Sequence, residues 1–121
     1  MSLLADLLAR MNSEPDLSEI QVLEDDAVDD ETFSFKVRAV IIPNFLQIRL
    51  LADKDFKRYS FQLYSDRPLL RWDNAPHYPN FSNFPHHFHG ADENVDPSLL
   101  TGDLLSDFDV VMADIKQFMK L

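Results

Sequence analysis

The sequence predicts an α+β fold, in which an antiparallel meander of about five strands is covered on one face by an N-terminal and a C-terminal helix. Two observations lead to this prediction. Runs of residues between positions 19 and 72 alternate apolar and polar side chains, as strands with one covered face do, and both ends of the chain carry apolar side chains at helical spacing. A chain of 121 residues fits one such domain, so we expect residues 1–121 to form a single unit.

A helix is expected at each end of the chain. Ser2 suits the N-cap of the first helix, and Pro15 is expected to end it. In the last helix, Asp103 lies near the start and Lys120 near the end, an order that the helix dipole favours. The apolar faces consist of Leu3, Leu4, Leu7, Leu8 and Met11 in the first helix, and of Leu104, Leu105, Phe108, Val111, Met112, Ile115 and Met119 in the last.

The strands of the sheet are expected between these helices. Their alternation places apolar residues on a covered face and polar residues on a wet one, as in antiparallel sheets. Short polar stretches between the runs suit hairpin turns, so consecutive strands should be neighbours. The predicted strands cover residues 19–24, 33–42, 45–51, 56–64 and 69–72.

The composition excludes several classes of protein. The chain has no cysteine, so it has neither a disulfide framework nor a thiolate site. The N-terminal stretch lacks the features of a signal peptide, and no apolar run approaches the roughly 20 residues needed to cross a bilayer. We therefore expect a cytoplasmic protein with no membrane partner.

The charge is distributed unevenly along the chain. The formal net charge of −10 opposes binding to nucleic acid, because phosphates repel a negative field. Residues 36–71, however, carry eight basic and three acidic residues, whereas residues 1–31 carry ten acidic and one basic residue. This asymmetry permits a local anion-binding face in the middle of the chain, although solvated strand faces explain it equally well.

All four histidines lie in a segment without helix or strand period, residues 73–96. Loops of this length in compact domains are usually functional or disordered. The segment holds four aromatic residues besides its histidines, and disordered stretches are poor in such residues. Three prolines stiffen it further. We therefore expect an ordered loop that displays its histidines as a site.

Three interpretations of the histidines remain open. Histidine suits metal-free cleavage of RNA, because its pKa of about 6.5 allows it to act as the base for the ribose 2′-hydroxyl or as the acid for the leaving oxygen. If the stretch His86-His87-Phe88-His89 is extended, His87 and His89 lie on the same side and His86 on the opposite side, and with Asp73, Asp92 or His77 they could instead hold a metal ion. Alternatively, the imidazoles are structural and donate to backbone carbonyls.

We expect the functional residues to come from this segment and the neighbouring strands. An arginine would stabilise the charge of the phosphorane, and a carboxylate or amide would orient a ring nitrogen. Aromatic rings would contact the substrate. The candidate catalytic residues are His77, His86, His87, His89, Arg71, Asp73 and Asn74, and the candidate substrate-binding residues are Arg58, Tyr59, Trp72 and Tyr78.

The stretch RWDNAPHYPNFSNFPHHFHG, residues 71–90, resembles the hallmark stretch of the TumE-like family, toxins of prokaryotic toxin–antitoxin modules. In that family, Arg-Trp/Tyr-Asp-Asn-x-Pro-His-His precedes Pro-His-His-x-His. The two parts correspond here to residues 71–78 and 85–89, and RYSFQL at residues 58–63 is similar to the family's aromatic strand. Two positions depart from the pattern, because Tyr78 and Gln62 stand where the family commonly has histidine.

The resemblance implies a small toxin that a cognate antitoxin neutralises. Combined with the chemistry of histidine, it leads us to expect action on RNA by a site that needs neither cofactor nor metal. The expected partners are the antitoxin and RNA, and a homodimer is left open. The alternatives are a metal-dependent hydrolase that uses the same histidines and a protein-interaction module without catalysis.

Overall fold

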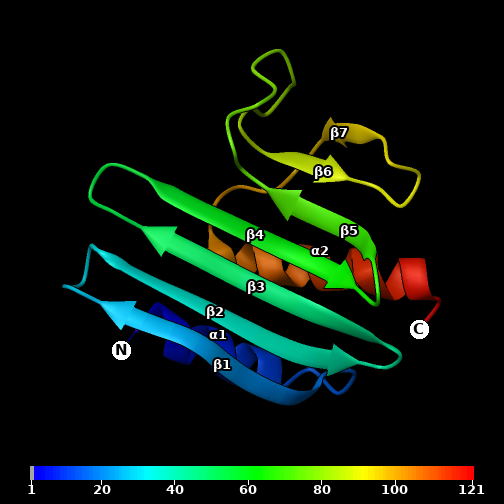
Figure 1. The fold of residues 1–121 in the computed structure, drawn as a ribbon, viewed down its shortest axis with the longest axis horizontal. Coiled ribbons are helices and arrows are strands. Elements are labelled where there is room, and N and C mark those ends of the chain that lie inside the picture. Colours follow the sequence, from blue (N-terminus) through cyan, green and yellow to red (C-terminus); the bar gives the residue numbers. More distant parts are fainter. Residues whose placement is uncertain (1) are drawn as a thin grey trace.

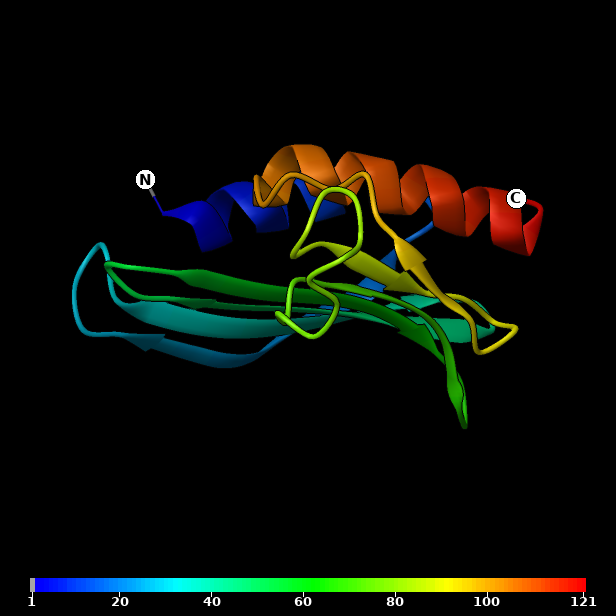
Figure 2. The same ribbon diagram turned by 90° about the horizontal axis from the view of Figure 1, so that it is seen from above.

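The computed structural model describes residues 2–121 and consists of one seven-stranded antiparallel sheet and two helices. The strands follow one another in sequence order across the sheet, and both helices lie against one of its faces (Figures 1 and 2). The elements are α1 (Leu3–Asn12), β1 (Ser18–Ala27), β2 (Phe33–Ile41), β3 (Asn44–Ala52), β4 (Lys57–Tyr64), β5 (Pro68–Asp73), β6 (His87–His89), β7 (Val95–Pro97) and α2 (Leu104–Met119).

The prediction of an α+β fold with terminal helices is confirmed, but the predicted number of five strands is wrong. The segment 73–96, expected to be a loop throughout, contributes β6 and the start of β7. Each of these strands has only three residues, which is too short for alternation to be recognised in the sequence. They form because β6 pairs antiparallel with β5, and β7 with β6.

The predicted ends and faces of the helices are confirmed. The hydroxyl of Ser2 accepts a hydrogen bond from the backbone N–H of Ala5 at 3.1 Å, which caps α1. Within α1, Leu7 and Met11 are fully buried. α2 ends at Met119, and the left-handed backbone of the following Lys120 (φ 60°) closes the helix. Its buried apolar side chains are Leu104, Phe108, Val111, Met112 and Ile115.

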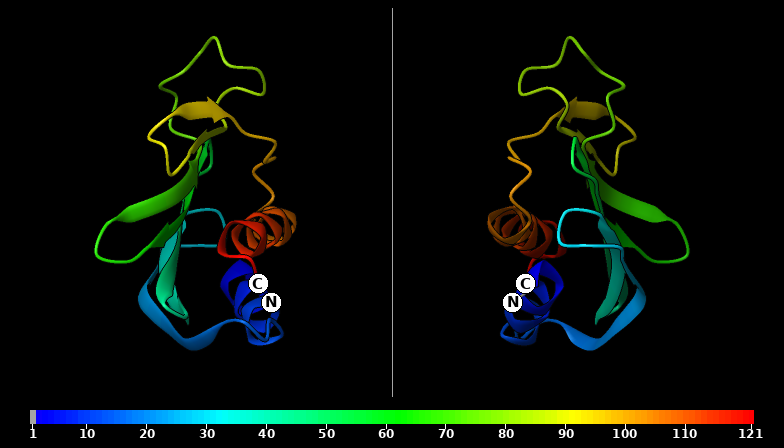
Figure 3. Two further views of the ribbon diagram at one scale, coloured as in Figure 1. Left: turned by 90° about the vertical axis from the view of Figure 1, so that its right-hand side faces the viewer. Right: turned by 90° about the vertical axis from the view of Figure 1, so that its left-hand side faces the viewer.

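The core lies between the helices and the inner face of β2 to β5. Side chains in these strands alternate between buried and more exposed positions, as the period of two requires. Seen along the sheet in Figure 3, both helices lie on the same side, and no helix of residues 2–121 covers the other side. We call this second side the open face. Polar and charged residues of β2 to β5 therefore point to solvent there.

The edge strand β1 differs from the others because nearly all of its residues are exposed. Its pairing with β2 contains two register shifts, which bend the strand. Across residues 2–121, no helix is long and apolar enough to span a bilayer.

Replacing Phe61 with alanine is expected to lower the free energy of unfolding by about 3–5 kcal/mol, because the ring is fully buried and its removal leaves a cavity. Urea denaturation followed by the fluorescence of Trp72 measures the change. Val28→Ala is the control: Val28 is 83% exposed, so its replacement should change stability by no more than about 0.5 kcal/mol. Equal effects of the two substitutions would contradict this core.

Candidate functional site

Strand register gathers four of the candidate residues on the open face. Arg71 and Asp73 lie two residues apart on β5, so their side chains share a face. In β6, His89 pairs with Arg71 and His87 pairs with Asp73. Cross-strand partners also share a face, so all four side chains meet on the open face.

The carboxylate of Asp73 is the centre of this group. Its Oδ1 lies 2.9 Å from Nε2 of His87 and accepts a hydrogen bond from the backbone N–H of Ala75 at 3.0 Å. Its Oδ2 accepts a hydrogen bond from Nε of Arg71 at 2.8 Å and lies 3.7 Å from Nε2 of His89. Asp73 as a whole residue is only 6% exposed, so these cationic and N–H partners stabilise the charge of its carboxylate.

His87 is held rigidly within the group. It is 1% exposed, and its Nδ1 lies 3.2 Å from the carbonyl oxygen of Pro85, opposite the contact with Asp73. Both ring nitrogens therefore face oxygen atoms, which fix the orientation of the ring. The ring of Tyr78 packs edge-on against His87 with the centroids 4.9 Å apart. His87 is thus positioned to orient Asp73 and not to contact a substrate.

His89 and Arg71 are the accessible members of the group. Their side chains are 37% and 40% exposed, whereas that of Asp73 is 8% exposed. Partial burial lowers the pKa of His89, the nearby carboxylate of Asp73 opposes this, and the positive charges around the ring lower it further. A neutral imidazole therefore predominates at neutral pH. Such a ring can accept a proton from a substrate.

Two further candidates lie beside the group. The ring of His77 is exposed, and its centroid is 6.5 Å from that of His87. Arg58 lines a hollow of about 290 Å³ in the open face, together with Arg71 and Asp73. Arg49 and Ser60, which the sequence did not single out, line the same hollow. The hollow thus brings three guanidinium groups to the edge of the carboxylate–histidine group.

His86 lies apart from the other three histidines, although it directly precedes His87. Neighbouring residues of an extended chain point to opposite sides, so His86 faces the helix layer. Its Nδ1 lies 2.6 Å from the hydroxyl of Tyr59, and the two rings stack at 5.7 Å. Burial raises the pKa of Tyr59, so the hydroxyl stays protonated and can donate a hydrogen bond to Nδ1 of His86. Tyr59 itself is only 5% exposed.

The remaining two candidates support the fold around the site. Trp72 is 3% exposed and packs against Phe88 in the core, with the ring centroids 5.0 Å apart. The side chain of Asn74 accepts a hydrogen bond from the N–H of Tyr59 at 3.0 Å and donates one to the carbonyl of Lys57 at 2.8 Å. Asn74 thereby continues the pairing of β4 and β5 beyond the end of β5, and it contacts no ring nitrogen.

Asp107 is a buried carboxylate whose role the sequence analysis missed. It is 2% exposed and accepts hydrogen bonds from the N–H and hydroxyl of Thr101 at 2.9 and 3.0 Å, and from the N–H of Gly102 at 2.8 Å. These bonds fix the turn that leads from β7 into α2, beside His86. The signal was present, because an acid between Leu104 and Phe108 lies on the apolar helix face and needs partners there.

One set of side chains has the donors of a metal site. Asp73, His87 and His89 each offer a ligand atom, and these atoms all lie within 4.8 Å of one another. Two imidazoles and a carboxylate suit Zn²⁺ and related ions. Asp92, considered for this set from the sequence, instead lies in the β6–β7 turn, where its carboxylate accepts hydrogen bonds from Asn94.

Acidification is expected to destabilise the fold partly through His86. Burial lowers the pKa of His86 below its ordinary 6.5, so the unfolded chain takes up this proton first as the pH falls. His86 therefore does not affect the free energy of unfolding above about pH 7.5, where the ring is neutral in both states. Below about pH 6.5 the free energy of unfolding falls progressively until the pH reaches the folded-state pKa of His86. In urea unfolding between about pH 8 and pH 5, His86→Gln should reduce the slope of stability against pH. An unchanged slope would contradict the burial of this ring.

Comparison with known proteins places the whole chain in a family. Neither a curated protein nor a solved structure matches the sequence. The model of one protein family, described as toxin TumE, matches residues 4–119. This match spans both helices and all seven strands, including the segments that carry Arg71, Asp73 and the histidines. The chain therefore belongs to the TumE toxin family.

Proposed function

We propose that this chain is the toxin component of a toxin–antitoxin module and that it cleaves RNA without a metal ion, using the group around Asp73. The observation that carries this proposal is the convergence of Arg71, Asp73, His87 and His89 on the open face, next to a hollow that holds two further arginines. A phosphodiester needs cationic groups and proton-transfer groups within reach of each other, and this face offers both.

His89 is the proposed general base. It removes the proton of the ribose 2′-hydroxyl, and the oxygen attacks the adjacent phosphorus. Asp73 lies 3.7 Å from Nε2 of the ring and stabilises the imidazolium that forms. His87 and Ala75 hold the carboxylate in place for this task. His87 and Asp73 therefore act as positioning residues.

The phosphate is held by arginines, and the leaving group takes its proton from a second histidine. Arg71 and Arg58 stabilise the negative charge of the phosphorane, which exceeds that of the ground-state phosphodiester. His77, exposed beside His87, is the proposed acid that protonates the 5′-oxygen as its bond to phosphorus breaks. The products are a 2′,3′-cyclic phosphate and a free 5′-hydroxyl.

His89→Ala is expected to lower the rate of RNA cleavage by about 10²- to 10⁴-fold, because the base of the reaction is lost. Purified protein and a labelled single-stranded RNA measure the rate, and thermal unfolding checks that the variant folds. His86→Gln is the matched control, since it removes an imidazole on the helix side of the sheet. Expression in bacteria should arrest growth with the wild type and the control but not with His89→Ala. Growth arrest by His89→Ala, or the absence of RNA products, would contradict the proposal.

A metal-dependent hydrolase is the second candidate, favoured by the donor set of Asp73, His87 and His89. The guanidinium of Arg71 weighs against it. Its Nε already donates to Oδ2 of Asp73 at 2.8 Å, so a cation bound there would meet a positive charge at close range.

Elemental analysis of the purified protein distinguishes the two candidates. We expect far less than one equivalent of any transition metal, and cleavage that is unchanged after treatment with a chelator. Stoichiometric zinc, together with activity that a chelator abolishes and added zinc restores, would establish the hydrolase instead. His89→Ala would then also lose the metal.

The antitoxin is proposed to recognise the acidic parts of the chain. Residues 1–31 carry a net charge of −9 and residues 72–121 a net charge of −6, and β1 with the turn after it is both acidic and exposed. A partner with a basic surface would be steered to this region, which raises its rate of association.

A further inference from the structure

We infer that the open face of β3 to β5 is a binding track for single-stranded RNA, leading from an aromatic platform of Phe45 and Tyr64 to the group around Asp73. This inference rests on the proposed function, since it names the class of RNA and the surface that holds it. It is carried by three features of the face: unpaired arginines, a stacked aromatic pair and a polar strip that joins them.

The first feature is the pair Arg49 and Arg58. Both side chains are exposed and line the hollow next to Arg71 and Asp73. Within residues 2–121, neither of them forms an ion pair, whereas Lys36 on β2 is paired with Glu24 at 3.1 Å. Two guanidinium groups without counter-charges attract anions. The backbone of a nucleic acid supplies a row of phosphates, which can contact Arg49 and Arg58 while one phosphate lies at the group around Asp73.

The second feature is the aromatic platform. Phe45 and Tyr64 are cross-strand partners on β3 and β4, and their rings stack with centroids 5.5 Å apart and planes 27° apart. Both are half-buried, although they lie on the face that no helix covers. The guanidinium of Arg38 lies 5.9 Å from the centroid of the Phe45 ring. Stacked rings that remain partly exposed beside cations bind bases through their π-faces.

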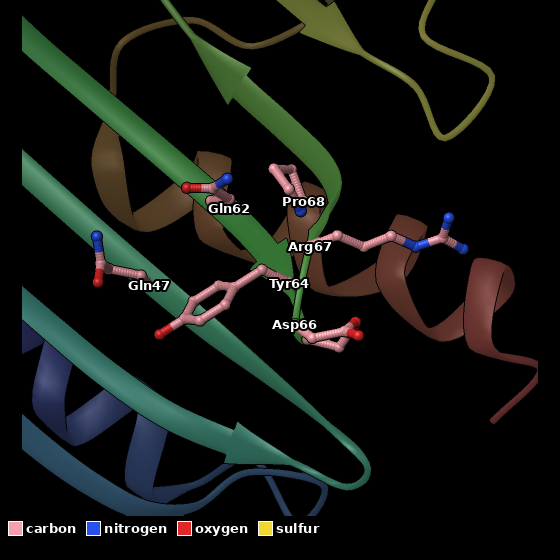
Figure 4. Close-up of a pocket in the computed structure, with 7 residues that line it drawn as sticks. Gln47, Gln62, Tyr64, Asp66, Arg67 and Pro68 are labelled. Atoms are coloured by element: carbon pink, nitrogen blue, oxygen red, sulfur yellow. The ribbon is translucent and has the colours of Figure 1, made fainter.

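The third feature connects the first two. Gln47 and Gln62 are cross-strand partners between the platform and the arginines, and Gln62 accepts a hydrogen bond from Arg71 at 3.4 Å. Figure 4 shows Gln47, Gln62 and Tyr64 around a shallow hollow of about 300 Å³, with the Tyr64 ring extending toward β3. Tyr64 and Ser60 are four residues apart on β4, a distance of about 13 Å along the strand. A short stretch of extended RNA therefore reaches from one end of the track to the other.

These features favour a single strand over a duplex. In duplex RNA the bases are stacked on each other and the grooves present backbone and base edges, so an aromatic platform has no ring face to contact. Unpaired bases are free to stack on Tyr64 and Phe45, and the backbone then lies over Arg49 and Arg58. The scissile phosphate is delivered to His89 and Arg71, which are cross-strand partners on β6 and β5.

The test is binding of a fluorescent single-stranded RNA whose 2′-hydroxyls are methylated, so that it cannot be cleaved by the proposed reaction. Tyr64→Leu keeps an apolar contact with Phe45 but removes the ring, and it should weaken binding by about 5- to 150-fold, as loss of one stacked base does. Tyr64→Phe should bind like the wild type. Fluorescence anisotropy gives the dissociation constants.

The arginines are tested through salt dependence. Arg49→Gln should weaken binding and reduce the slope of log K against log salt by about 0.7, the value for one phosphate contact on a single strand. Arg10→Gln changes the charge equally but lies on α1 in the helix layer, so it should leave both quantities unchanged. A duplex of the same sequence should bind more weakly than the single strand.

The inference is overturned if Tyr64→Leu and Arg49→Gln bind like the wild type, if no single-stranded probe binds, or if the duplex binds as tightly as the single strand. It is also overturned if both variants bind RNA normally but escape the antitoxin, since the face would then belong to that partner. Its failure differs from that of the proposed function. If Tyr64→Leu binds and cleaves RNA like the wild type, only the proposed binding track is contradicted. If RNA binds as expected but is never cleaved, only the proposed reaction is contradicted.

Discussion

The structure of this site depends on a single buried carboxylate. Asp73 ends β5, and its two oxygens are contacted by Arg71, the N–H of Ala75 and His87, with His89 nearby. A carboxylate in a residue as buried as Asp73 is stable only with such partners, and it holds these partners in place in turn. The short strand β6 is thereby joined to β5 by side chains as well as by the backbone.

Alternation along the strands separates structural from chemical roles. Trp72 and Phe88 point inward and pack together, while their neighbours Asp73 and His87 point outward and meet on the open face. The helices cover only the inward side, so the sheet supplies a rigid base for groups that contact solvent. Sites built on strands are held more accurately than sites on mobile loops. The group around Asp73 meets this condition.

Much of the fold could be predicted from the sequence, because β2 to β5 and both helices are long enough for their periods to be recognised. β6 and β7 could not, since three residues contain no measurable period and their pairing depends on β5, which is distant in the chain. For the candidate site, the sequence pointed to the histidine segment as a whole and not to the contacts that each histidine makes. An extended backbone was expected to place His86 opposite His87 and His89, but the sequence could not establish that this stretch is a strand, because its pairing with β5 has no local signal. Asp107 was not recognised as a buried group, although its position on the apolar face indicated burial.

Because His86 and His87 point to opposite sides of the sheet, the register of β6 against β5 determines which imidazole contacts Asp73. If β6 were displaced by one position, every side chain would change sides. His86 would then turn toward solvent, and the imidazole that supports Asp73 would be withdrawn into the interior. Insertions in residues 75–85 are therefore tolerated only if Phe88 still packs against the indole of Trp72. This aromatic contact fixes the register of β6 against β5.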